Sequence, residues 1–154
     1  MSEQSPRRRA GFTLIEVFTV LALVSVVMVM SYRPISRSFS RNERANAKRK
    51  VAAYVFRARA TAVQRGQKTW FVRSGNIMKV LVDSSGVKVR VGQAVDLKTA
   101  HDVVFTSSPL DTVEFDPRGF ATNIATSERY LLSRGGVVDT VCILGLGKVR
   151  TKGC

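Results

Sequence analysis

The first strong pattern along the chain is a run of mostly hydrophobic residues from Phe12 to Met30. As a helix these 19 residues rise roughly 28 Å, which nearly matches the hydrocarbon core of a bilayer. Glu16 is the one ionisable residue in the run. Because a carboxylate at membrane depth is costly unless it is paired, the pattern predicts a membrane-spanning helix in which Glu16 needs a partner.

Beyond this run the spacing of residues predicts that the helix continues. Pro34 predicts a kink, no further Gly or Pro occurs before Gly66, and Gly66 is typical of a residue that ends a helix. The first part of this segment carries a basic stripe at helical spacing, namely Arg33, Arg37, Arg41, Arg44 and Lys48. The second part carries an apolar face, namely Val51, Tyr54, Val55, Ala58 and Ala62. We expect the stripe to face solvent or a partner and the apolar face to pack on a domain.

After Gly66 helical spacing gives way to short alternating segments separated by Gly, Ser, Asp and Pro. The predicted strands are Thr69–Arg73, Ile77–Val82, Val87–Val91, Asp102–Phe105, Thr112–Phe115, Ala121–Ile124, Tyr130–Ser133, Val137–Leu144 and Lys148–Thr151. One long helix followed by antiparallel strands is an α+β architecture. We expect Tyr54, Trp70 and Phe71 to be core aromatic residues.

Charge is distributed unevenly along the chain, whose net charge is +14. Residues 33–68 hold eleven Lys and Arg against one acid, Glu43, whereas residues 69–154 hold eleven against eight. The basic character is therefore concentrated on the helix beyond the apolar run. Such a distribution favours anionic partners: lipid headgroups, nucleic acid or acidic neighbouring subunits.

The sequence offers little for catalysis or metal binding. His101 is the one histidine and lies in no nucleophile motif. Cys and His do not recur at metal-ligand spacing, and no glycine-rich phosphate loop occurs. We therefore predict a protein that is not an enzyme and that has no cofactor and no metal site.

The order of Arg7–Arg9, Gly11, Phe12–Ile15 and Glu16 resembles the type III signal of type IV pilins and type II secretion pseudopilins. The resemblance implies that a prepilin peptidase cuts between Gly11 and Phe12 and methylates the new amino terminus of Phe12. It also implies that Glu16 pairs with the terminal amine of a neighbouring pilin or pseudopilin subunit during assembly. Physically, a buried ammonium and a buried carboxylate offset each other only when paired, which favours one axial register.

Two simpler interpretations explain less. A cleavable secretory signal has a shorter apolar region and a small-x-small site, which Met30–Arg33 does not offer. An ordinary anchor leaves Glu16 unexplained. Basic residues after the span outnumber the three arginines before it, so charge alone predicts a cytoplasmic body. We give precedence to the processing signal, which has no purpose in that orientation.

The helix end Arg57–Gly66, the strand after it and the segment Val113–Gly119 resemble the GspH/FimT branch of minor pseudopilins and minor pilins. The resemblance implies a pilin-like fold in four parts. These are a leader over residues 1–11, a transmembrane helix over 12–34, a basic amphipathic helix over 35–66 and a β-rich periplasmic domain over 67–154. We therefore expect a single-pass protein of the inner membrane that later enters a pilus or pseudopilus.

The two cysteines, Cys142 and Cys154, lie near the C-terminus. In an oxidising periplasm they would form a disulfide, and otherwise they are two free thiols. A tight hairpin at Leu144–Gly147 would pair Cys142 with about Val149. A disulfide to Cys154 therefore requires the tail to turn back.

Lys148, Arg150 and Lys152 occupy alternate positions and are expected on one face of a strand or tail. The segment Gly147–Arg150 is similar to the Gly-Arg-x-Arg element of FimT-type minor pilins that take up DNA, with lysine in place of the first arginine, which loses bidentate contact with phosphate. A solvated strand face is the other interpretation. The leading hypothesis is thus a structural minor pilin or pseudopilin at filament initiation or at the tip, and the alternative is a DNA-binding minor pilin used in natural transformation.

Overall fold

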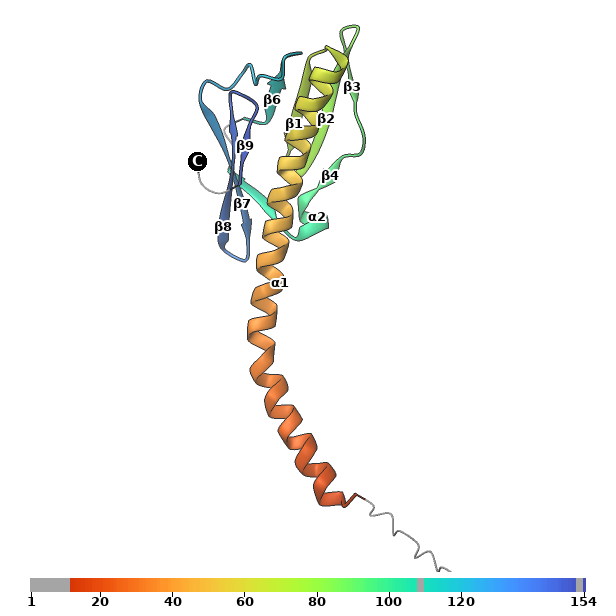
Figure 1. Cartoon of the computed structure of the whole chain (residues 1–154), viewed down its shortest axis with the longest axis vertical. Coiled ribbons are helices and arrows are strands. Elements are labelled where there is room, and N and C mark those ends of the chain that lie inside the picture. Colours follow the sequence, from red (N-terminus) through yellow and green to blue (C-terminus); the bar gives the residue numbers. More distant parts are fainter. Residues whose placement is uncertain (1–11, 108–109, 152–153) are drawn as a thin grey trace, which may run out of the picture. The chain divides into compact units, whose positions relative to one another are not determined.

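The computed structural model describes residues 12–107, 110–151 and 154, and the side chains of residues 31–37 lie outside this description. The chain divides into two compact units, one that ends at Phe39 and one that spans Ser40–Cys154. Helix α1 (Leu14–Arg65) begins in the first unit and ends in the second, and all the strands described belong to the second unit (Figure 1). The predicted α+β class, one long helix followed by antiparallel sheet, is confirmed.

The end of α1 agrees with its sequence signal. Gly66 follows the last helical residue, Arg65, with a φ of +61°, a left-handed conformation that costs glycine little. The N–H of Gln67 donates to the carbonyl oxygen of Ala62 at 3.3 Å. This six-residue return bond is the mark of a Schellman C-terminus, so the prediction of a helix end at Gly66 is confirmed.

The first sheet contains five strands in the spatial order β3-β2-β1-β6, with β4 paired to β2 outside that path. Its members are β1 (Thr69–Ser74), β2 (Ile77–Ser84), β3 (Val87–Arg90), β4 (Val95–Asp96) and β6 (Thr112–Phe115). In this register Phe71 lies opposite Val80 on β2 and Val113 on β6. All three side chains are fully buried, so they form one row of the core.

The second sheet has four strands in the order β5-β7-β8-β9. They are β5 (Val104–Ser107), β7 (Ser127–Arg134), β8 (Val137–Leu144) and β9 (Val149–Arg150). Strands β7 and β8 pair over their whole length as a hairpin. Alternation along them directs Tyr130 and Leu132 into the core and leaves Arg129 on the outer face.

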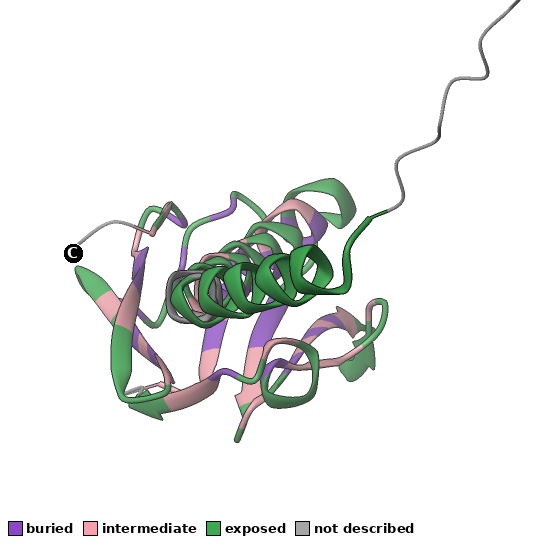
Figure 2. Ribbon diagram, turned by 90° about the horizontal axis from the view of Figure 1, so that it is seen from below, coloured by how far each residue is buried: buried purple, intermediate pink, exposed green. Residues whose placement is uncertain are grey.

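One hydrophobic core joins the helix to both sheets. The predicted apolar face of α1 is confirmed, because Val51, Tyr54, Val55, Ala58 and Ala62 are all buried in it. Tyr130 packs edge-on against Phe71 and Phe105, with ring centroids 6.0 Å and 6.1 Å apart, and its hydroxyl donates to the carbonyl oxygen of Leu110 at 2.9 Å. Buried residues lie on the parts of the strands beside the helix (Figure 2).

The prediction of a strand at Ala121–Ile124 is wrong. Ala121 makes one isolated bridge to Phe115, and the segment then turns. Asn123 explains the difference, because its amide donates to the carbonyl oxygen of Thr112 at 2.7 Å and accepts from the N–H of Glu114 at 2.9 Å. A side chain thus satisfies the edge of β6 that a strand would otherwise pair with.

A short helix, α2 (Leu97–His101), was not predicted from the sequence. Asp96 caps its first turn by accepting a hydrogen bond from the N–H of Lys98 at 2.8 Å, and Asp102 ends it in a left-handed conformation. Five residues are too few to display helical spacing, so the cap was the one available signal.

Candidate functional site

The N-terminal end of α1 is organised around Thr13. The N–H of Glu16 donates to Thr13 Oγ1 at 3.3 Å and to the carbonyl oxygen of Thr13 at 3.1 Å, and the N–H of Val17 donates to that carbonyl at 3.3 Å. Thr13 is therefore the N-cap, and Glu16 occupies the third helical position, the spacing of a capping box. A carboxylate there is favoured by the positive end of the helix dipole.

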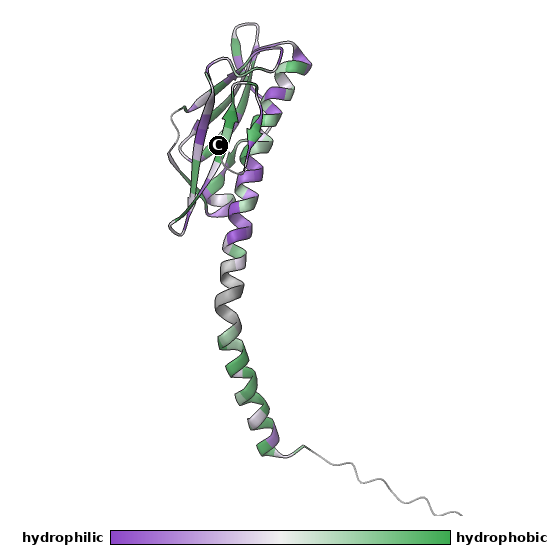
Figure 3. Ribbon diagram, turned by 60° about the vertical axis from the view of Figure 1, so that its left-hand side comes forward, coloured by the Kyte–Doolittle hydropathy of each residue, from purple (hydrophilic) through white to green (hydrophobic). Residues whose placement is uncertain are grey.

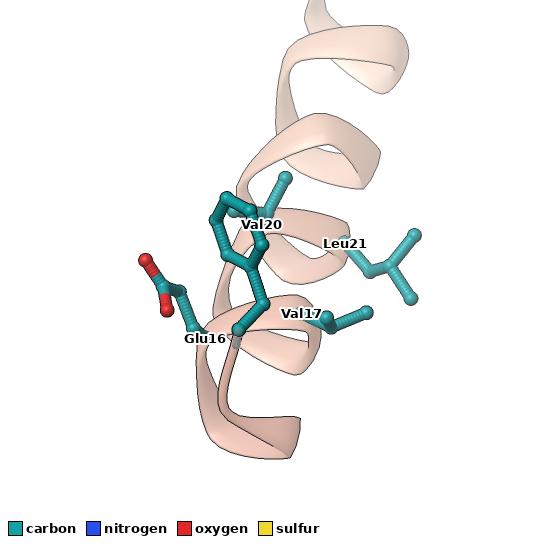
Figure 4. Close-up of a pocket in the computed structure, with 5 residues that line it drawn as sticks. Glu16, Val17, Val20 and Leu21 are labelled. Carbon is teal, nitrogen blue, oxygen red and sulfur yellow. The ribbon is translucent and has the colours of Figure 1, made fainter. Parts of the chain in front are cut away.

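The carboxylate of Glu16 has no partner in the part of the chain that the structure describes. Its carboxylate points away from Val17 and Leu21 (Figure 4), and within the described residues no hydrogen bond or ion pair engages it. Beside it lies an open hollow of about 230 Å³, lined by Phe12, Glu16, Val17, Val20 and Leu21. The hollow is apolar, and the carboxylate of Glu16 is itself exposed and open to an incoming group.

The other polar residues of the apolar run differ from Glu16 because they satisfy themselves. Thr19 Oγ1 donates to the carbonyl oxygen of Ile15 at 2.8 Å, and Ser25 Oγ donates to that of Ala22 at 2.7 Å. Backbone oxygens in their own helix therefore serve as their acceptors, and neither residue requires a second chain.

Hydrophobic residues dominate α1 along its first part and give way to hydrophilic ones further on (Figure 3). Within the described residues, no helix reaches the combination of length and hydropathy that defines a membrane span. The predicted leader, which includes Gly11 and the three arginines, lies outside the described residues.

Part of the basic stripe faces the domain, which corrects the expectation that the stripe faces solvent or a partner. Asp139 on β8 receives both Lys48 Nζ at 2.9 Å and Arg44 Nη1 at 3.5 Å. On the same helix Glu43 Oε2 lies 2.8 Å from His101 Nδ1 of α2. These contacts join residues 43–48 of α1 to strand β8 and to helix α2. Arg41, by contrast, is exposed.

The C-terminal basic residues come together with a third one that sequence reasoning missed. Arg129 lies opposite Cys142, and Cys142 lies opposite Arg150. Lys148 continues the ladder, its carbonyl accepting from the N–H of Leu144 at 2.9 Å. Because residues directly opposite share a face, Arg129, Lys148 and Arg150 lie on the outer face of this sheet, and all three are exposed.

Arg129 could have been found from the alternation in β7, since buried Tyr130 and Leu132 direct it outward. Its place on the same face as Arg150, with Cys142 of β8 between them, depends on strand register, which the sequence does not show. Lys152, the third predicted residue, lies outside the described residues.

A disulfide joins Cys142 to Cys154 in the structure, with their Cα atoms 5.6 Å apart. The expected hairpin forms, but Cys142 lies opposite Arg150 rather than Val149. Cys154 is therefore held against β8, next to the basic residues of the outer face.

Gly147 has a structural reason to be glycine. A Cβ atom there would lie 2.5 Å from the carbonyl oxygen of Gly119 and 3.0 Å from Arg59 Cδ, and the residue has a φ of +72°. Its presence in the Gly147–Arg150 segment is thus explained by packing of the β8–β9 turn against α1.

The aromatic residues occupy two different environments. Tyr54 and Phe71 belong to the core, as predicted, whereas Trp70 is buried on the opposite face of the first sheet. There Lys88 Nζ lies 4.4 Å from the centre of the Trp70 ring, and Nε1 of Trp70 donates to Glu114 Oε2 at 3.1 Å. A lysine covers this ring, so Trp70 does not present a free stacking surface.

Glu114 is the centre of this outer cluster. Lys68 Nζ donates to its Oε1 at 3.0 Å. That hydrogen bond is the largest cause that lowers the pKa of Glu114. Burial acts in the opposite direction, and the hydrogen bond from Trp70 lowers the pKa further. The hydrogen bond between Lys68 and Glu114 also raises the pKa of Lys68.

In the part of the chain that the structure describes, no three His, Cys, Asp or Glu side chains come close enough together to hold a metal ion. His101, the one histidine, is occupied by Glu43. The most distinctive groups are therefore Glu16 and the outer basic face.

Comparison with known proteins adds two findings. Residues 6–32 match the prokaryotic N-terminal methylation motif. The fold is similar to crystal structures of the type IV minor pilin FimU of Pseudomonas aeruginosa strain PAO1. In space group P21 the TM-score is 0.61 at 17% identity, over 73% of this chain and 90% of FimU. In space group P65 it is 0.57 at 15% identity, over 71% and 92%. No curated protein sequence matches.

The chain therefore combines an N-terminal methylation motif with the fold of a type IV minor pilin.

The Glu114 cluster predicts a pH dependence of stability. The pKa of Glu114 is lower in the folded chain than its ordinary value of 4.5. The ionised carboxylate therefore stabilises the fold fully above pH 4.5, and this contribution is lost as the pH falls through the lowered pKa. We expect unfolding in urea, followed by Trp70 fluorescence, to show a smaller acid loss of stability in Glu114→Gln than in the wild type. Glu128→Gln on the other sheet is the control. Parallel curves for wild type and Glu114→Gln would contradict the assignment.

Proposed function

We propose that this protein is a minor pilin or pseudopilin of the GspH/FimT type, a structural subunit at the initiation site or tip of a type II secretion pseudopilus or type IV pilus. The observation that carries the proposal is Glu16, whose carboxylate has no partner among the described residues and lies at the start of an apolar helix within the methylation motif. The role is assembly rather than catalysis.

The N-terminal motif supports membrane anchoring of the chain before assembly. Residues 12–34 would form a single pass of the inner membrane, with the domain in the periplasm. The apolar composition of Phe12–Met30 supports this placement, and the Cys142–Cys154 disulfide suits an oxidising compartment. Prepilin peptidase and other pilin or pseudopilin subunits are the partners this function requires.

Assembly through Glu16 follows from electrostatics. Cleavage after Gly11 would create an α-ammonium on Phe12, which is placed at the same end of α1 as Glu16. In a bundle of apolar helices the ammonium of one subunit and the carboxylate of the next each lack an alternative partner. Their pairing therefore stabilises the axial offset between neighbouring helices that brings the two charges together.

Processing is the first test. The mature chain should begin at N-methylated Phe12, and the intact mass of membrane-extracted protein should correspond to loss of residues 1–11 and gain of one methyl group. Gly11→Val should leave the precursor in the membrane. Retention of the leader by the wild type in a host with prepilin peptidase would rule out the proposed function.

Assembly is the second test. Glu16→Val should insert and be cleaved normally, but its incorporation into sheared filaments should fall more than tenfold. The reason is that leaving one member of a buried ion pair alone costs about 3–5 kcal/mol, and about 1.4 kcal/mol is a factor of ten. Thr19→Val is the matched control, since Thr19 bonds its own helix. Wild-type incorporation of Glu16→Val would reduce Glu16 to a tolerated polar residue.

A second candidate function is DNA binding for uptake. The supporting observation is the exposed set Arg129, Lys148 and Arg150 on the outer face of the second sheet, since Glu128 of β7 and Asp139 of β8 alternate to the other face. Cations at this spacing suit phosphates of a duplex without reading its sequence. Lys152 would extend the same set.

The DNA hypothesis predicts a change in salt dependence. Lys148→Ala with Arg150→Ala in the full chain should reduce the slope of log K against log salt by about two, and Arg129→Ala by about one more. The matched control is Arg41→Ala with Arg49→Ala, two exposed helix cations. Arg44 is unsuitable because it pairs with Asp139. Equal losses from both pairs would indicate diffuse attraction and exclude a specific DNA site.

A further inference from the structure

The face of α1 turned away from the core, between Ser40 and Arg65, exposes apolar side chains. Phe56 is 66% exposed and Val63 is 53% exposed. Together with Arg49 they recur every seven residues, so they lie nearly in line along the helix. Ala53 and Ala60 beside them are small enough to let another helix approach closely.

A shallow hollow marks the same face. It has a volume of about 270 Å³ and is lined by Phe56, Arg59, Ala60, Val63 and Gln64. Four of the five, Phe56, Arg59, Ala60 and Val63, stand at the i, i+3, i+4 and i+7 positions that form the receiving hole in knobs-into-holes packing. The surface therefore has the shape that a neighbouring helix fits.

The charge of this helix segment limits which helix can fit. Between Ser40 and Arg65 there are eight Lys and Arg against one acid, Glu43. Glu43 is occupied by His101, and Asp139 of the sheet occupies Arg44 and Lys48. Within the described residues no ion pair engages the remaining six cations, which are Arg41, Arg49, Lys50, Arg57, Arg59 and Arg65.

A second copy of the chain is a poor occupant of this face. Packed helices lie about 8–10 Å apart, which is about one Debye length at physiological ionic strength. Two copies would therefore place Arg49 and Lys50 near their own counterparts without effective screening. Burying these cations with no counter-charge would add a desolvation cost.

A bare polyanion is also a poor occupant. Phosphates would neutralise the cations, but they would leave Phe56 and Val63 in water. A helix with apolar residues at its centre and carboxylates at its margins satisfies both features at once.

We propose that this face of α1 is the docking site for a helix of a different subunit, one that places Asp or Glu against Arg49 and Lys50 and apolar side chains against Phe56 and Val63. The proposal rests on the proposed function, since it supposes assembly with other pilin-like subunits. In this arrangement the neighbours of the chain in the filament are different subunits, and two copies of this chain are not adjacent.

The experiment uses the full chain with a photo-crosslinking phenylalanine analogue in place of Phe56. The probe is a second, tagged full-length copy, produced in the same cells, that is either wild type or Arg49→Glu with Lys50→Glu. The two glutamates of the reversed copy can pair with Arg49 and Lys50 of the crosslinking copy. We therefore expect at least five times more adduct with the reversed copy than with the wild-type copy. A copy with Arg90→Glu and Lys98→Glu, two exposed cations off this helix, controls for total charge and should give no gain.

In the producing organism, mass spectrometry of the natural adduct should map to a helix of another subunit that contains Asp or Glu. This adduct should be lost in Arg49→Glu with Lys50→Glu. Efficient adducts between wild-type copies, a mapped helix without acids, or adducts to lipid or nucleic acid would each overturn the inference. Phe56→Ala should unfold like the wild type, since the side chain is mostly exposed, and a lower stability would mean that Phe56 serves the fold instead.

The two proposals fail separately. A chain that is processed at Phe12 and enters filaments, yet crosslinks to its own wild-type copy, overturns the docking inference alone. A chain that keeps its leader overturns the proposed function.

Discussion

Burial of one face of α1 against two small sheets is the interaction on which the rest of the domain depends. Neither sheet covers its own apolar face, and a few short strands need a packed partner to be stable. Val51, Val55 and Ala58 supply that partner from the helix, and Tyr130 links the sheets by packing on Phe71 and Phe105. The helix is therefore the centre of the core and not an attachment to it.

This arrangement divides the circumference of α1 among three tasks. One side fills the core, a second side holds Asp139 through Arg44 and Lys48, and a third side remains exposed with Phe56 and Val63. The same helix begins at Thr13 with a carboxylate that has no partner among the described residues. A chain built in this way can stabilise its own domain and still leave a helix surface and a charged group exposed.

The C-terminal part of the domain follows a related logic. Close packing of Gly147 on Gly119 and Arg59 fixes the β8–β9 turn to the helix, and the disulfide fixes Cys154 to Cys142 of β8. As a result the outer face of the second sheet presents Arg129, Lys148 and Arg150 on a rigid support. A surface of this kind can hold cations together at fixed spacing, which loose tails cannot.

The sequence by itself determined the long helix, its end at Gly66, its buried face and the α+β class, because these depend on local spacing and on one glycine. It also singled out Glu16, since an ionisable residue in an apolar run is visible without coordinates. Tertiary structure alone decided which strands pair, and hence that Arg129 and Arg150 lie on either side of Cys142. It also decided that Asn123 replaces a strand, that Trp70 lies outside the core, and that Arg44 and Lys48 face Asp139. These features join residues far apart in the chain, and their energies depend on register and burial, which no local pattern encodes.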